Sequence, residues 1–153
     1  MKKVINFPPQ KISNCHDFYS NYIKIKNELL KKIDKKEIEK VIQEILIASK
    51  KKKNIFACGN GGSASTAEHL SCDFSKGSST NTNLDLKVYS LNSNTSLITA
   101  IANDISYEDV FSYQLNRFGK ANDILLLFSV SGSSKNILKC AKIAKRKKIK
   151  IIS

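Results

Sequence analysis

The sequence predicts an α/β fold with a doubly wound parallel sheet, preceded by an N-terminal helical hairpin. Short apolar runs alternate with helix-like segments from residue 53 onwards, and two of these runs lead directly into glycine- or serine-rich turns that open a helix. Two amphipathic segments lie ahead of the first apolar run. We therefore expect a single domain over 1–153, with N-terminal helices over 13–50 and a parallel α/β core over 53–153.

Composition limits the protein class. The hydrophobic fraction of 41% in 153 residues supports one core. The N-terminal residues lack the apolar core and cleavage site of a signal peptide, and no apolar stretch has the length of a membrane span, so we expect a cytoplasmic protein without membrane contact. The four cysteines form no C-x-x-C pair, which favours small buried hydrophobic residues over a disulfide framework or a zinc knuckle.

The charge is strongly basic, with 26 Lys and Arg against 13 Asp and Glu, a formal net charge of +13. Such a balance suggests nucleic-acid binding. However, the lysines are spread over helix surfaces with few aromatic residues among them, and Arg occurs only as Arg117 and Arg146. We favour lysines that solvate helix faces, so a nucleic-acid partner is not expected, whereas anionic substrates would still be attracted.

Two helices are expected before the first strand. Residues 1–12 should be irregular because Pro8-Pro9 prevent a helix, and Ser13 or Asn14 can then cap the first one. Asp34 and Glu37 resemble a capping box for the second. The apolar stripes are Phe18, Tyr22, Ile25 and Leu29, and then Ile38, Val41, Ile42 and Ile45. These stripes can pack on the chain's own sheet or join subunits, and we favour a homo-oligomer.

The first strand leads into a glycine turn. Asn54–Cys58 reads as the strand, Gly59–Gly62 as the turn, and Ser63 as the start of a helix to about Lys76. Glycines let the backbone approach a ligand, and the positive end of the helix dipole favours an anion. The alternative is a plain turn between a strand and a helix.

His69 and Asp73 are four residues apart and therefore share one face of that helix. This spacing suits metal binding or acid/base chemistry, although an ordinary surface pair has the same spacing. Because the helix begins at the glycine turn, both side chains can face the same cleft.

The middle of the chain supplies a second carboxylate. Gly77 ends the helix, Leu86–Leu91 is the next strand, and Asn94–Ala102 is a short helix that leads into Asn103 and Asp104. Asp104 can contact a ligand hydroxyl or cap the next helix, about Tyr107–Phe118, and both interpretations remain open.

A second anion loop follows the next strand. Asp123–Phe128 is continuously apolar from Ile124, which is typical of a central strand buried on both faces. It leads into Ser129–Ser134 and a helix to about Lys147, and Lys148–Ser153 is the last strand. Two such loops at the carboxyl edge of one parallel sheet favour a phosphate monoester.

Two nucleotide-binding alternatives fit less well. Gly59, Gly61 and Ala64 match the dinucleotide pattern G-x-G-x-x-A, but the following strand ends at Leu91-Asn92-Ser93 without the acidic residue that binds a ribose. A Walker loop does not occur. A small phosphorylated molecule is therefore the expected ligand.

Taken together, the motifs resemble the sugar isomerase (SIS) domain family, in its phosphoheptose isomerase branch. They are Gly59–Ser65, His69-x-x-x-Asp73, Ala100–Asp104 with Tyr107–Phe111, and Ser129–Ser134-x-Asn136. The resemblance implies a doubly wound, flavodoxin-like SIS fold, a homotetramer and zinc. It also implies interconversion of sedoheptulose 7-phosphate and D-glycero-D-manno-heptose 7-phosphate, which supplies heptose for lipopolysaccharide or capsule synthesis.

The resemblance also implies roles for single residues. Those implied for substrate binding are Ser63, Ser129, Ser131 and Ser134 at the phosphate, Asn60, Gly61, Gly62 and Val130 lining the site, and Asn103 and Asp104 at the sugar hydroxyls. His69 and Asp73 would bind zinc, and Asp73 would also contact substrate and act as the catalytic base. The family usually has a glutamate at the position of Asp73, which is one methylene longer.

Family members continue beyond the position of Ser153 through a strand and a helix that carry a glutamine and a histidine of the metal site. By this resemblance we expect either a C-terminally truncated representative or a SIS module that binds a sugar phosphate, or serves as a protein scaffold, without catalysis.

Overall fold

A computed structural model describes residues 14–80 and 82–153. The chain forms two compact units, one ending at Glu39 and the other spanning Lys40–Ser153. The expectations for residues 1–12 and for a cap at Ser13 lie outside the described residues. The prediction of one domain over 1–153 stays a prediction.

The first unit contains α1 (Cys15–Lys31) and the start of α2 (Lys35–Lys50). Asn14 caps α1, because its Oδ1 accepts a hydrogen bond from the backbone N–H of Asp17 at 2.9 Å. Asp34 Oδ1 accepts from the backbone N–H of Lys36 at 2.8 Å at the start of α2. Both helices therefore begin where the sequence predicted. No residue within Cys15–Lys31 is buried, and of the predicted apolar stripe Phe18, Tyr22 and Leu29 are exposed.

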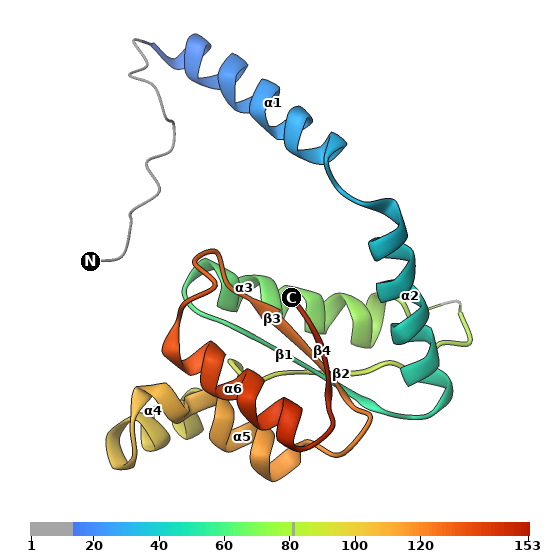
Figure 1. The fold of residues 1–153 in the computed structure, drawn as a ribbon, viewed down its shortest axis with the longest axis vertical. Coiled ribbons are helices and arrows are strands. Elements are labelled where there is room, and N and C mark those ends of the chain that lie inside the picture. The colour runs from blue at the N-terminus through green and yellow to red at the C-terminus, as the bar shows by residue number, and fades with distance from the viewer. Residues whose placement is uncertain (1–13, 81) are drawn as a thin grey trace. The chain divides into compact units, whose positions relative to one another are not determined.

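The second unit is built on a parallel sheet of four strands in the order β2-β1-β3-β4 (Figure 1). The strands are β1 (Asn54–Gly59), β2 (Lys87–Ser90), β3 (Ile124–Phe128) and β4 (Lys150–Ile152). This order reverses direction at β1 and β3, which is the topological switch point of a flavodoxin-like sheet. The predicted doubly wound parallel sheet is confirmed, and its switch point lies between the two predicted anion loops.

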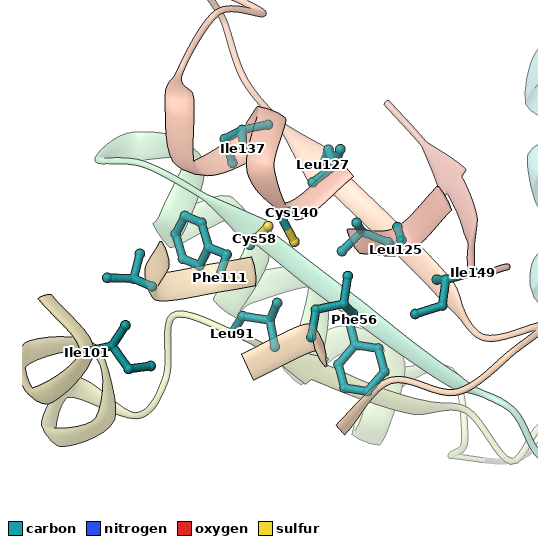
Figure 2. Close-up of a cluster of buried hydrophobic side chains, with 13 residues drawn as sticks. Phe56, Cys58, Leu91, Ile101, Phe111, Leu125, Leu127, Ile137, Cys140 and Ile149 are labelled. Carbon is teal, nitrogen blue, oxygen red and sulfur yellow. The ribbon is translucent and has the colours of Figure 1, made fainter. Parts of the chain in front are cut away.

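Helices cover both faces of this sheet. On one face α4 (Thr95–Asp104), α5 (Val110–Phe118) and α6 (Lys135–Arg146) pack against Phe56, Cys58, Leu125 and Leu127 (Figure 2). On the other face α3 (Gly62–Cys72) and the end of α2 pack against Ile55, Ala57, Ile124 and Leu126. Alternate residues of β1 and β3 thus serve opposite cores, as period-2 side-chain geometry requires. Each buried aliphatic side chain contributes about 1.5–3 kcal/mol, so the central strands are firmly held.

The stripe of α2 is divided between burial and exposure. Within the second unit, Ile45 and Ala48 pack against the core formed with α3, whereas Ile42 is exposed. The end of the stripe therefore packs on the chain's own sheet, and Ile42 remains available for another surface.

The cysteines do not behave alike. All four, which lie within the described residues, are free thiols. Cys58 and Cys140 are buried, and Figure 2 shows their sulfur atoms close together in the core. A hydrogen bond with Cys140 and burial raise the pKa of the Cys58 thiol well above its usual range. Cys15 and Cys72 are exposed, so the expectation that all four are buried is wrong for these two.

Two helix boundaries differ from the sequence prediction. The helix predicted to about Lys76 is α-helical over Gly62–Cys72 and continues as one π-helical turn, η1 (Asp73–Gly77). Gly77 ends it, as predicted. The helix predicted from Tyr107 begins with a 3₁₀ turn, η2 (Tyr107–Asp109), before α5. In the described part of the chain, no helix combines the length and the apolar character that crossing a membrane requires.

Candidate functional site

The glycine loop and the serine loop are neighbours at the carboxyl edge of the sheet. Gly59 at the end of β1 is paired with Phe128 at the end of β3, so Asn60 and Ser129 leave the sheet side by side. Because the loop after β1 enters α3 on one face and the loop after β3 enters α6 on the other, the two loops lie at the switch point of the sheet. The structure therefore brings the two predicted anion loops together.

The glycine loop is shaped by a close approach and by a left-handed residue. A Cβ on Gly59 would lie 2.6 Å from backbone atoms of Ser63, so only glycine lets α3 turn back so tightly onto β1. Gly61 has φ of +57°, which glycine adopts without strain. The chain then enters α3 at Gly62, one residue before the predicted start at Ser63.

The serine loop is held by its own hydroxyls. Ser129 Oγ accepts from the backbone N–H of Gly132 at 3.1 Å, and Ser131 Oγ accepts from that of Ser133 at 3.3 Å. The side chain of Val130 is 87% exposed, so Val130 can line the site only through its backbone. Ser134 is half-buried at the start of α6.

Neither helix that opens at these loops has a side-chain cap at its N-terminus. Within the described residues, α1, α4 and η2 receive side-chain caps from Asn14, Asn94 and Ser106, whereas α3 and α6, like α5, begin without one. A helix N-terminus without a side-chain cap leaves its N–H groups and its dipole to another acceptor. Both loops therefore carry the local electrostatics of an anion site.

Three residues that the sequence analysis gave no role join the loops. Asn92, directly after β2, exchanges two hydrogen bonds with the backbone of Gly59, at 3.2 and 2.9 Å. Asn136 at the start of α6 exchanges two with the side chain of Asn60, at 2.9 and 2.8 Å, and the Tyr107 hydroxyl donates to Asn60 Oδ1 at 3.1 Å. Their positions in the sequence could have indicated this role, because polar residues just after a strand or at the start of a helix lie at this edge of the sheet.

Three ion pairs fasten η2 to α6. Lys135 Nζ lies 2.8 Å from Glu108 Oε1, and Lys139 Nζ lies 3.6 Å from Glu108 Oε2 and 2.9 Å from Asp109 Oδ2. The hydrogen bond from Lys135 lowers the pKa of Glu108, and that from Lys139 lowers the pKa of Asp109. The same contact with Asp109 raises the pKa of Lys139. Together these pairs hold η2, which carries Tyr107, against α6.

His69 and Asp73 meet as their spacing predicted, with Nε2 and Oδ2 3.3 Å apart. Both side chains are exposed, 81% for His69 and 59% for Asp73. Zinc sites use three or four protein donors in tetrahedral geometry. Among the described residues no group of three or more His, Cys, Asp or Glu gathers, so this pair supplies only half of such a set and does not form a zinc site by itself.

Asn103 and Asp104 lie at the end of α4, and Asn103 Nδ2 donates to Asp104 Oδ1 at 2.8 Å. The interpretation of Asp104 as a helix cap is wrong. Ser106 performs that function, because its Oγ accepts from the backbone N–H of Glu108 at 3.0 Å. The side chains of Asn103 and Asp104 are both exposed, so a carboxylate oxygen of Asp104 remains available to a ligand hydroxyl.

A family model described as the SIS domain matches residues 17–153. The chain belongs to the SIS domain family. A SIS-fold structure, the phosphoheptose isomerase of Neisseria gonorrhoeae, superposes with a TM-score of 0.78 at 30% identity, covering 87% of this chain and 68% of that one. The resemblance and the fold drawn from the sequence motifs are thus confirmed.

Relatives of this SIS domain include two curated proteins described as phosphoheptose isomerases. The protein of Helicobacter pylori strain HPAG1 is 46% identical over 99 residues, which are 65% of this chain and 51% of the relative. That of Clostridium acetobutylicum is 38% identical over 112 residues, 71% of this chain and 55% of the relative. The chain spans about half the length of the curated relatives it matches.

Proposed function

We propose that this SIS domain is an aldose–ketose isomerase that converts sedoheptulose 7-phosphate to D-glycero-D-manno-heptose 7-phosphate. The observation that carries the proposal is the pair of anion loops at the switch point, joined to a helix that bears His69 and Asp73. The two curated relatives and the neisserial protein, all described as phosphoheptose isomerases, support the same substrate.

The phosphate is assigned to the two loops. Hydroxyls of Ser63, Ser129, Ser131 and Ser134 and backbone N–H groups of Gly61, Gly62 and Val130 would surround it. The absence of side-chain caps on α3 and α6, both described in full, supports this assignment because a dianion there completes both helix ends. The net charge of +13 adds a general attraction for anionic substrates.

The acid/base end is assigned to α3 and α4. A residue at the position of Asp73 lies about 16 Å along the helix axis from Gly62, at 1.5 Å per residue. A seven-carbon sugar phosphate held by its phosphate at the loops would extend its C1 and C2 along α3 in the direction of that end. Asn103 and Asp104 would bind the hydroxyls between them.

The chemistry needs a base that moves one proton. The Asp73 carboxylate would take a proton from C1 of the ketose, the electrons would form the enediol, and the proton would return to C2 while the hydroxyl proton leaves O1 for O2. The Asp73 side chain is 59% exposed, which supports this role because its carboxylate is open to a ligand. His69 and Asp73 are the donors that this part of the chain offers to zinc, and the proton transfer itself rests on Asp73.

A homo-oligomer, specifically a tetramer, belongs to the same proposal. The exposed apolar stripe of α1 supports it, since Phe18, Tyr22 and Leu29 are solvent-exposed in the single chain. A cytoplasmic enzyme that supplies heptose for lipopolysaccharide or capsule synthesis is the biological setting that fits this substrate.

Turnover of sedoheptulose 7-phosphate by the purified chain with added zinc tests the proposal, with appearance of the aldose as the readout. Turnover that disappears in Asp73→Asn supports it. Binding of the sugar phosphate without turnover would instead favour a SIS module that binds its ligand without catalysis, an alternative that the two-donor set among the described residues supports. Absence of both binding and turnover would contradict both.

A further inference from the structure

A network of four hydrogen bonds joins the glycine loop, the start of α6 and η2. Asn60 Nδ2 donates to Asn136 Oδ1 at 2.9 Å, and Asn136 Nδ2 donates to Asn60 Oδ1 at 2.8 Å. The Tyr107 hydroxyl donates to the same Asn60 Oδ1 at 3.1 Å. The backbone N–H of Ile137 donates to Asn136 Oδ1 at 2.9 Å. We call these three side chains, Asn60, Asn136 and Tyr107, the amide latch.

The direction of every bond in the amide latch follows from one backbone group. The N–H of Ile137 can only donate, so the Asn136 atom that faces it must be Oδ1. The Asn60 atom that bonds to Asn136 Oδ1 must then be the donor Nδ2. In the second bond of the pair, Asn136 Nδ2 must donate to Asn60 Oδ1. Because Asn60 Oδ1 can only accept, the Tyr107 hydroxyl must give its proton to it.

This polarity determines what the amide latch offers to a ligand. The two lone pairs of Asn60 Oδ1 are used by Asn136 and Tyr107, so that oxygen is not available to substrate. The Tyr107 oxygen has given away its proton and retains lone pairs, and the Tyr107 side chain is 58% exposed. At the rim of an anion site, this oxygen is an acceptor for a hydroxyl and an unfavourable neighbour for a phosphate oxygen.

Burial strengthens the Asn60–Asn136 part of the amide latch, whereas the bond from Tyr107 lies at the exposed surface. Asn136 is 3% exposed, and its bonds join residues 76 positions apart in the sequence. Hydrogen bonds in such surroundings are strengthened, and losing a partner there is costly. The ion pairs of Glu108 and Asp109 with Lys135 and Lys139 hold η2 against α6. Tyr107 is the first residue of η2, so these pairs also restrict its position.

We infer that Asn136 is a positioning residue that sets the spacing of the two anion loops, and that the Tyr107 oxygen selects ligands with a sugar hydroxyl next to the phosphate. The inference rests on the proposed function for its ligand, a sugar phosphate. It assigns Asn60 to the site through its backbone, since its side-chain oxygen is occupied within the amide latch.

The first test compares two ligands, inorganic phosphate and sedoheptulose 7-phosphate, by titration calorimetry. Tyr107→Phe removes only the oxygen, so we expect about a tenfold loss of affinity for the sugar phosphate and a change of less than about twofold for inorganic phosphate. Tyr113→Phe is the matched control, because Tyr113 is an exposed tyrosine of α5 outside the amide latch. Equal effects on both ligands, or none on either, would overturn the role of Tyr107.

The second test addresses Asn136 through Asn136→Leu, which keeps a similar size and adds no charge. We expect about a tenfold loss of affinity for inorganic phosphate, because the loops lose their common spacing. Asn116→Leu is the control, since Asn116 is an exposed residue that pairs with Arg146. A lower melting temperature at unchanged phosphate affinity would show a merely structural role and would overturn the positioning role.

A double-mutant cycle joins the two tests. If Asn136 orients Asn60, and Asn60 orients Tyr107, then Tyr107→Phe should have little further effect on sugar-phosphate affinity in the Asn136→Leu background. Additive losses would overturn the coupling. Failure of the proposed function is distinguishable, because it would appear in the unmodified chain as sugar-phosphate affinity no greater than that for inorganic phosphate, which would also remove the selective role of Tyr107.

Discussion

The two ends of the candidate site are built differently. At the proposed phosphate end, Asn92 and Asn136 each form two hydrogen bonds with the glycine loop, and the Tyr107 hydroxyl donates one. Asn136 and Tyr107 lie on separate elements far along the chain from this loop. At the proposed acid/base end, the side chains of His69 and Asp73 contact each other, with Nε2 and Oδ2 3.3 Å apart, and both are exposed. The backbone of the first end is fixed by tertiary contacts, whereas the side chains of the second depend on the spacing of one helix.

The two ends therefore differ in how far the single chain organises them without a ligand. The phosphate end is pre-organised before any ligand arrives, which lowers the entropic cost of binding. The acid/base end requires substrate, metal or another surface to complete it, since an exposed side-chain pair is only weakly held. Binding and catalysis should therefore be separable by substitution, and the following predictions test that separation.

The largest effect is expected at the acid/base end, in catalysis alone. Asp73→Asn removes the proposed base and should lower kcat by about 10²–10⁴, while the melting temperature and phosphate affinity stay nearly unchanged because Asp73 is exposed. Steady-state kinetics and calorimetry measure the two. Glu68→Gln, an exposed carboxylate on the same helix, is the control. A loss of phosphate affinity in Asp73→Asn would contradict the separation of the two ends.

The next effect is expected at the phosphate end, in stability and binding together. Gly59→Ala places a Cβ 2.6 Å from the backbone of Ser63, so α3 must shift from β1. We expect the free energy of unfolding to fall by about 2 kcal/mol, with weaker phosphate binding. Urea denaturation measures the first quantity. Gly77→Ala is the control, since a Cβ there meets no atom within 4 Å, and an equal loss in both variants would refute the proposed clash.

A smaller effect concerns the support of the phosphate end. The pKa of Asp109 is lowered in the folded chain by the hydrogen bond from Lys139. A carboxyl group with a lowered folded pKa contributes stability above its unfolded pKa, and that stability is lost as the pH falls through the folded value. Acidification through the ordinary aspartate range and below should therefore lower the melting temperature, and Lys139→Met should reduce the contribution from Asp109 by about 2 °C. Identical pH profiles for both proteins would show that the pair adds nothing.

The smallest effect on function is expected from thiol labelling, which should distinguish the buried cysteine near the glycine loop from the exposed one next to Asp73. Cys58 lies in β1 beneath the glycine loop, is buried and has a raised pKa, whereas Cys72 is exposed beside Asp73. In the native chain a maleimide should label Cys72 and Cys15 within minutes, and Cys58 and Cys140 at least about a hundredfold more slowly. Peptide mass spectrometry over a time course separates the four sites. Rapid labelling of Cys58 would mean that the phosphate end opens readily.

Most of the fold could be predicted because periodicity and turn chemistry are local signals. The run Ile124–Phe128 predicted a strand buried on both faces, and β3 occupies a central position in the sheet with that burial. The pair His69 and Asp73 could be placed on one face because helical spacing alone decides it. Asp104 was ambiguous because a carboxylate before a helix fits a cap, and Ser106, two residues later, took that position through the 3₁₀ start.

Local sequence signals were enough to predict the elements, the glycine and serine loops and the family, since each motif depends on residues close together in the chain. How the two loops are joined depends on tertiary contacts. Asn60 and Asn136 are 76 positions apart, and their pairing arises because β1 and β3 are neighbours at the switch point. The same holds for the cysteines, since burial of Cys58 and exposure of Cys72 depend on which helices cover each face. Local signals choose secondary structure, whereas contacts and burial are decided by packing between distant segments.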